Sequence, residues 1–388
     1  MTPAAVTPVV GTGSRADVAV AERIVVKIGS SSLTGADGLL DVDALHRLVD
    51  VLAARRAEGK QVVLVTSGAI AAGVGPLGLT GRPKDLATAQ AAASVGQGLL
   101  VARYAQAFGA HGLRVGQVLL TVEDTVRRGH YRNAQRTLET LLDLGVVPIV
   151  NENDTVATHE IRFGDNDRLA ALVSHLVRAD GMVLLTDVDG LYDAPPSQPG
   201  AHRIREVRST ADLEGVEVTG RGSSVGTGGM ITKLDAVRIA SASGVAAVLA
   251  RSDQVAAALA GEDVGTFFAI TGKRSSRRRL WIGYAARSQG RLVLDAGAVR
   301  AVQGGRASLL PAGVVSVEGE FDTGDVVDLV SEEGRVVARG IVAFDAAELP
   351  QLLGRSTHDL RADLGEGYDR ELVHRDDLVL VRGRRSAS

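Results

Sequence analysis

Two lysines of this chain lie where the sequence favours the binding of a phosphate group. Lys27 lies near the end of the apolar run 23–28 and is followed by Gly29 and three serines, and Lys233 follows the glycine-rich stretch 226–229. An ammonium group neutralises phosphate charge, and backbone N–H groups of a Gly/Ser turn or of a helix start bind phosphate oxygens. Lys27 taken alone could equally be a surface lysine beside a turn. For Lys233, a place in the first turn of a helix is unfavourable unless an anion binds there.

A second group of polar residues suits an amino-acid ligand. Ser67 follows the apolar run 61–65, and Asp154 lies in the polar stretch 151–155 after the run 146–150. Consecutive polar residues at the end of a buried strand are costly unless they bind something, and the amides together with Asp154 suit an ammonium and a carboxylate group. For Ser67, the alternative is a tight turn between a strand and a helix.

Asn166 and Asp167 directly precede an expected helix, 168–177. Asn and Asp are common helix caps, but capping explains only one residue of the polar stretch 164–167. Nearby carboxylates could organise the lysines or hold Mg²⁺ through water, and capping combined with solvation is the alternative.

Thr186 and Asp187 follow the apolar run 182–185 and stand before a glycine. Polar groups at the mouth of a sheet could contact adenine and ribose. An ordinary Asp-Gly turn explains the same residues equally well.

Strands and helices are expected to alternate along most of the chain. Short runs that are apolar throughout, separated by helical patterns, predict an α/β fold with a mostly parallel sheet sandwiched by helices. Such sheets bind ligands beyond the carboxyl ends of their strands, which is where the polar groups described above would lie. The expected strands are 23–28, 61–65, 115–120, 146–150, 182–185 and 245–249, and the expected helices are 41–58, 85–110, 131–143, 168–177 and 229–243.

Composition excludes several classes of function. The chain has 388 residues, a formal net charge of −3, 3% aromatic residues and no cysteine. Disulfides, thiolate metal sites and cysteine nucleophiles are therefore excluded, and the global charge gives no indication of nucleic-acid binding. No apolar run reaches the roughly 20 residues of a membrane span, and the N-terminus lacks the pattern of a secretory signal. A cytoplasmic protein is expected.

Taken together, six segments resemble the amino-acid kinase superfamily, and within it the branch that phosphorylates the side-chain carboxylate of glutamate as the first step of proline biosynthesis. A looser similarity links the C-terminal part to the mostly β PUA barrel. The kinase-like segments are VVKIGSSSLT (25–34), VTSGAIAAG (65–73), PKDLATAQAAASVGQ (83–97), VNENDTVATHEIRFGDND (150–167), LTDVDGLYD (185–193) and GTGGMITKLDA (226–236). The expected organisation is a flexible N-terminal extension (1–22), an amino-acid kinase domain (23–270), a basic linker (271–290), a PUA domain (291–372) and a C-terminal tail (373–388).

The resemblance implies a role for each matching residue. Lys27 and Lys233 would hold the γ-phosphoryl group of ATP, and Asp167 would lie between them and orient them. Ser67, Asp154 and Asn166 would bind glutamate. ATP, with Mg²⁺ carried mainly by its phosphates, would be bound by Lys27, Thr186, Asp187, Thr227, Gly228, Gly229, Met230, Ile231, Thr232 and Lys233.

The resemblance also implies regulation and interactions. Proline would inhibit the enzyme at or near the glutamate site, the chain would form a homo-oligomer (dimer or tetramer), and the labile product would be handed over to a glutamyl-phosphate reductase. One alternative is a kinase that acts on aspartate, acetylglutamate or a nucleotide. Another is an RNA-binding protein, because PUA domains often bind RNA; the low aromatic content and the negative charge argue against it.

Overall fold

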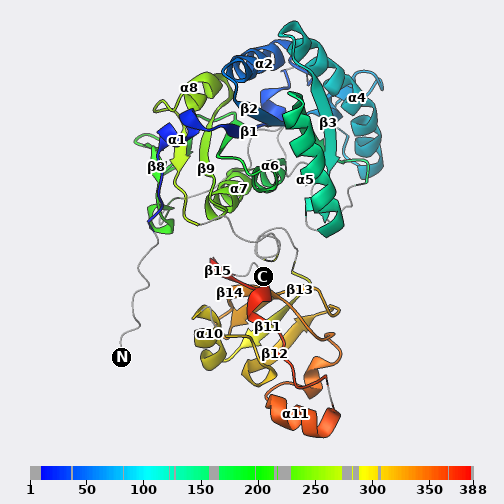
Figure 1. Ribbon diagram of the computed structural model, residues 1–388, viewed down its shortest axis with the longest axis vertical. Helices are drawn as coiled ribbons and strands as arrows, with labels where there is room; N and C mark the ends of the chain where they lie inside the picture. The colour runs from blue at the N-terminus through cyan, green and yellow to red at the C-terminus, as the bar shows by residue number, and fades with distance from the viewer. Residues whose placement is uncertain are drawn as a thin grey trace. The chain divides into compact units, whose positions relative to one another are not determined.

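An eight-stranded sheet forms the centre of the larger of two structural units in this computed structural model (Figure 1). The units comprise Met1–Ser275 and Ser276–Ser388. The structure describes residues 10–35, 38–81, 83–121, 123–125, 128–156, 166–196, 198–213, 216, 229–272, 282, 288–304, 307–365 and 367–385. Most of the segment expected to be a basic linker therefore lies outside the described residues.

The strands of this sheet run in the order β3-β4-β2-β1-β5-β9-β10-β8, and every neighbouring pair is parallel except β9 and β10. The central strands are apolar on both faces because helices cover both faces, which confirms the predicted fold class. The short strands β8 and β10 were not predicted from the sequence. The bounds are β1 (Arg23–Ile28), β2 (Gln61–Val65), β3 (Val115–Leu120), β4 (Val147–Glu152), β5 (Gly181–Thr186), β8 (Glu206–Val207), β9 (Ala246–Arg251) and β10 (Thr266–Phe268); β6 (Leu191–Tyr192) and β7 (Arg203–Ile204) pair separately.

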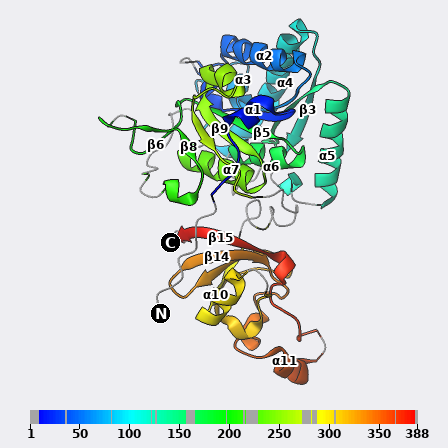
Figure 2. The same ribbon diagram turned by 60° about the vertical axis from the view of Figure 1, so that its left-hand side comes forward.

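Helices cover both faces of the sheet (Figures 1 and 2). On one face, buried side chains of α2, α4 and α8 join a core with those of β1, β2, β5 and β9. On the other face, α6 and α7 pack against each other, with α6 on β1 and β5 and α7 on β9. The bounds are α1 (Arg15–Val20), α2 (Val42–Ala57), α3 (Ala69–Val74), α4 (Leu86–Ala110), α5 (Arg128–Asp143), α6 (Asn166–Leu176), α7 (Met230–Ala242) and α8 (Val255–Leu259).

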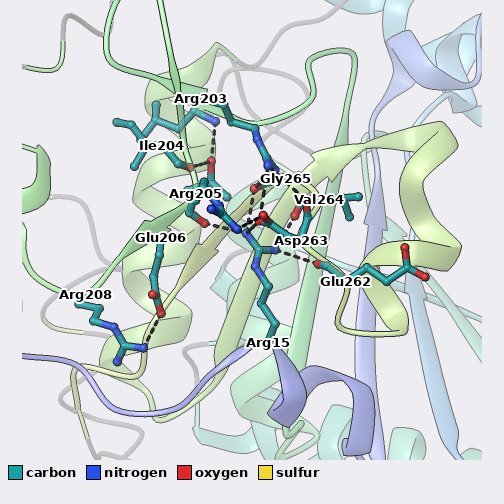
Figure 3. A network of polar contacts seen from close by, with 12 residues as sticks. Arg15, Arg203, Ile204, Arg205, Glu206, Arg208, Glu262, Asp263, Val264 and Gly265 are labelled. Atoms are coloured by element: carbon teal, nitrogen blue, oxygen red, sulfur yellow. Dashed lines mark hydrogen bonds and ion pairs between the residues drawn. The ribbon is translucent and has the colours of Figure 1, made fainter.

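The N-terminal segment differs from the flexible extension expected for residues 1–22. From Val10 onward, its described part packs against the sheet: Thr12 pairs with Ile270 through the backbone, and Val18 of α1 is fully buried. Arg15 reaches residues far along the chain, donating a hydrogen bond of 2.5 Å to the carbonyl oxygen of Val264 and pairing with Asp263 (Figure 3). These partners lie roughly 250 residues away in sequence, so a local pattern could not indicate them.

The smaller unit contains a five-stranded sheet in the order β12-β11-β13-β14-β15. Residues 373–388 were expected to be a tail, but Val373 is fully buried and β15 pairs with β14. The last strand was missed because its sequence is rich in arginine and not apolar throughout. The bounds are β11 (Gly290–Leu294), α10 (Ala296–Gln303), β12 (Val314–Gly319), β13 (Val326–Ser331), β14 (Arg335–Ile341), α11 (Thr357–Leu364) and β15 (Leu378–Arg385).

Two glycines allow α3 to lie against α4. A Cβ atom on Gly96 would lie 1.8 Å from the carbonyl oxygen of Ala69, and one on Gly73 would lie 1.9 Å from that of Ala92. Neither helix could approach so closely with a larger residue at these positions. Because α3 directly follows the turn that contains Ser67, this contact also fixes the turn.

We expect Gly96→Ala to destabilise the larger unit by about 1–3 kcal/mol, because the added methyl group must push the two helices apart. Gly98, two residues along α4, provides the control, because a Cβ atom there would have open space around it. Gly98→Ala should leave the unit as stable or raise its stability by up to ~1 kcal/mol, since alanine favours helix. Thermal unfolding of both variants tests this, and equal melting temperatures would contradict the packing argument.

Candidate active site

A buried carboxylate joins two lysines at the carboxyl ends of the strands. The Nζ atom of Lys27, near the end of β1, lies 2.5 Å from Oδ1 of Asp167, and Nζ of Lys233 lies 3.2 Å from Oδ2. Asp167 lies in the first turn of α6 and Lys233 in the first turn of α7. All three residues are at least nine-tenths buried, with exposed fractions of 4%, 1% and 9% for Lys27, Asp167 and Lys233. We call these three residues the lysine–aspartate cluster.

The charges of the cluster determine how Asp167 ionises. Burial alone would raise the pKa of this carboxyl group, but the positive charges of Lys27 and Lys233 and their hydrogen bonds outweigh burial and lower its pKa to about 2. Asp167 is therefore ionised at neutral pH. The hydroxyl oxygen of Thr232 lies 3.0 Å from Oδ2 of Asp167, which further ties α6 to the start of α7.

Beside the cluster, hydrogen bonds connect the ends of β2, β4 and α6. The backbone N–H of Glu152 donates to Oδ1 of Asn151 at 2.9 Å and to Oδ1 of Asn166 at 3.2 Å. These bonds fix which end of each amide is oxygen. Nδ2 of Asn166 in turn donates to Oγ of Ser67 at 3.0 Å. The Ser67 hydroxyl accepts this bond, so its own proton can be donated to a ligand.

The other residues implied by the resemblance, as far as the structure describes them, follow the ends of β4 and β5 or begin α7. Asp154 is half-buried in the turn after β4, and Thr186 ends β5 with its hydroxyl group donating to Asp187 at 2.9 Å. Gly229 precedes α7, and Met230, Ile231 and Thr232 form its first turn. Thr227 and Gly228 lie outside the described residues.

The structure adds three residues to the site region: Asn151 and Glu152, which the sequence indicated only as part of the polar stretch 151–155, and Gln97, which was not predicted. Asn151 and Glu152 connect Asn166 to β4, and Gln97 of α4 accepts a hydrogen bond of 2.6 Å from Nδ2 of Asn151. The polar stretch after β4 indicated that something binds there. Its pairing with a glutamine more than fifty residues earlier is a tertiary contact that no spacing reveals.

Comparison with known proteins identifies the families that the chain matches. The amino acid kinase family matches residues 22–252, and the PUA domain matches residues 290–364. A glutamate 5-kinase of Streptomyces avermitilis is 63% identical over 371 residues, covering 95% of this chain and 99% of that protein. A glutamate 5-kinase of Thermobifida fusca is 59% identical over 377 residues, covering 96% and 97%.

Among solved structures, an isopentenyl phosphate kinase of T. acidophilum aligns with 63% of this chain and 99% of its own at 21% identity. Its TM-score of 0.44 is too low to bear on function. None of the described helices combines the length and apolarity that crossing a membrane requires. From the match over residues 22–252 and the identity to curated relatives, this chain belongs to the amino acid kinase family, in which it groups with the glutamate 5-kinases, and it carries a C-terminal PUA domain.

Proposed function

We propose that this protein transfers the γ-phosphoryl group of ATP to the side-chain carboxylate of L-glutamate, forming L-glutamyl 5-phosphate and ADP in the first step of proline biosynthesis. The observation that carries the proposal is the lysine–aspartate cluster beside the Ser67–Asn166 hydrogen bond. The name of the curated relatives supports the choice of glutamate.

The reaction needs no general base from the protein. A glutamate side chain has a pKa of ~4.3, so the attacking oxygen is already a carboxylate at neutral pH. The carboxylate oxygen forms a bond to the γ-phosphorus while the bond from that phosphorus to the bridging oxygen of ADP breaks. Catalysis then consists of positioning and charge neutralisation, and the ammonium groups of Lys27 and Lys233 supply that charge at the transferred group.

Asp167 acts on the lysines in this proposal. Two ammonium groups held near one carboxylate repel each other in a buried place, where charges are weakly screened. The carboxylate offsets this repulsion and fixes the position of both Nζ atoms, and the phosphoryl group brings further negative charge. Asp167 is therefore a positioning residue.

Ser67, Asn166 and Asp154 bind glutamate in this proposal. The free hydroxyl proton of Ser67 suits a carboxylate, and the carboxylate of Asp154 suits the ammonium group. Proline carries the same pair of groups on its α-carbon. We therefore propose that it competes for this site as a feedback inhibitor.

We further propose that ATP lies against Thr186, Asp187 and residues 227–233, together with Mg²⁺. No three acidic or histidine side chains gather as a metal site among the described residues, and both oxygens of Asp167 contact lysines. The described side chains thus do not form a cage for Mg²⁺, and we propose that it enters on the phosphates of ATP, whose charge it would partly neutralise. A homo-oligomer, a place in the cytoplasm and hand-over of the product to a reductase complete the proposal.

ATP turnover with trapping of the acyl phosphate by hydroxylamine tests the proposed reaction. We expect hydroxamate with L-glutamate but not with L-aspartate or N-acetyl-L-glutamate, and we expect proline to suppress it. Hydroxamate from another acid would overturn the substrate while keeping the phosphoryl chemistry. Absence of turnover with all three acids would overturn the proposal and favour a nucleotide kinase or an RNA-binding protein.

The lowered pKa of Asp167 predicts how stability depends on pH. Because its pKa falls from 3.8 to about 2 on folding, ionised Asp167 contributes about 2–3 kcal/mol of stability. This contribution is complete above pH ~4 and is lost as pH falls towards ~2. We expect Asp167→Asn to be less stable than the wild type at neutral pH, with a difference that shrinks over this range. Urea unfolding at stepped pH measures it, and a difference that does not depend on pH would contradict the assignment.

A further inference from the structure

Gln97 has a hydrogen-bonding group that the interactions described above do not use. It lies on α4, where its Oε1 atom accepts a bond of 2.6 Å from Nδ2 of Asn151. The neighbouring Ser94 contacts Thr155 at 3.2 Å. This side of α4 therefore faces the polar turn that follows β4.

Backbone contacts fix the orientation of the Gln97 amide. Oδ1 of Asn151 accepts from the backbone N–H of Glu152, an N–H that cannot act as an acceptor. Nδ2 of Asn151 must then face Gln97, so the atom of Gln97 that faces it is the oxygen. The Nε2 group, with two N–H donors, points elsewhere.

Nε2 of Gln97 is inaccessible to solvent and has no hydrogen-bond partner in the described part of the chain. Leaving a buried donor unsatisfied costs free energy, and more than nine in ten buried backbone groups and most buried side-chain groups in proteins are paired. A donor left free next to a binding site is explained when the ligand is its partner.

The order of the strands indicates which part of the ligand this donor meets. Lys27 is on β1 and Asn151 on β4, with β2 and Ser67 between them. Neighbouring strands lie ~4.8 Å apart, so the backbones of β1 and β4 lie roughly 10 Å apart across the sheet. An extended five-carbon dicarboxylate has one carboxylate at each end, so it can reach from the end of β1 towards the end of β4. If the side-chain carboxylate lies at the lysines, the α-carboxylate lies towards β4.

We propose that Nε2 of Gln97 donates a hydrogen bond to the α-carboxylate of the amino-acid substrate and so helps to determine specificity. The inference rests on the proposed function and adds a residue to its substrate site. Asn151 holds the amide in the donating orientation, and the Glu152 backbone holds Asn151.

Gln97→Glu changes only the atom in question, because the carboxylate keeps an oxygen for Asn151 and replaces Nε2 by a second oxygen. At about pH 8, where an ordinary glutamate side chain is ionised, we expect the KM for L-glutamate to rise about 10- to 100-fold. The KM for ATP should stay close to the wild-type value, and the melting temperature should fall because the variant buries a negative charge. Gln106→Glu, at an exposed position of the same helix, introduces the same charge and should change neither KM.

L-Isoglutamine, in which an amide replaces the α-carboxylate, separates a substrate contact from a structural role. Its amide can donate to a glutamate side chain at position 97, so Gln97→Glu should lower the KM for isoglutamine relative to that for glutamate. A parallel change in both KM values, or an unchanged KM for glutamate, would overturn the inference. If Gln97→Glu does not fold, Gln97→Met with about a tenfold higher KM for glutamate supports it, and a wild-type KM contradicts it. Wild-type turnover of glutamate tests the proposed function independently.

Discussion

The salt bridges from Lys27 and Lys233 to Asp167 are the interaction on which the proposed activity depends. Two ammonium groups do not remain close together in a buried place without a carboxylate between them. The sheet supplies one lysine from the end of β1, and the first turns of α6 and α7 supply the other two groups. Contact between α6 and α7 therefore sets the geometry of the cluster. The low pKa of Asp167 is the electrostatic consequence of this arrangement.

The proposed amino-acid side of the site is built by a different means. Here one backbone N–H group, that of Glu152, donates to the side-chain amides of both Asn151 and Asn166. These two hydrogen bonds fix the orientation of both amides. The close contact of α3 with α4 at Gly73 and Gly96 holds the turn that contains Ser67 at the carboxyl end of β2. In the proposed site, an acid of a different length would displace one carboxylate and leave buried amides unpaired, which favours discrimination against it.

Much of the sheet could be predicted because each central strand is a short run of apolar residues followed by a turn. The strand ends predicted where Lys27, Ser67 and Thr186 would gather, and the resemblance to a family implied the role of Asp167. Other features depend on contacts between distant segments, which local patterns do not encode. Examples are the packing of α1 through Arg15, the two-residue strand β8, the arginine-rich strand β15 and the bond between Asn151 and Gln97.

The most direct test of the central claim is the kcat of Lys27→Ala and of Lys233→Ala, measured with saturating ATP and glutamate. Each variant should lose at least ~10²-fold in kcat, the usual consequence of removing one preorganised electrostatic group. Lys60→Ala removes a lysine that pairs with Glu22 at the amino ends of β1 and β2, the ends opposite to the cluster. This variant should retain wild-type turnover. A kcat near the wild-type value in either cluster variant would contradict the account that both lysines stabilise the transferred phosphoryl group.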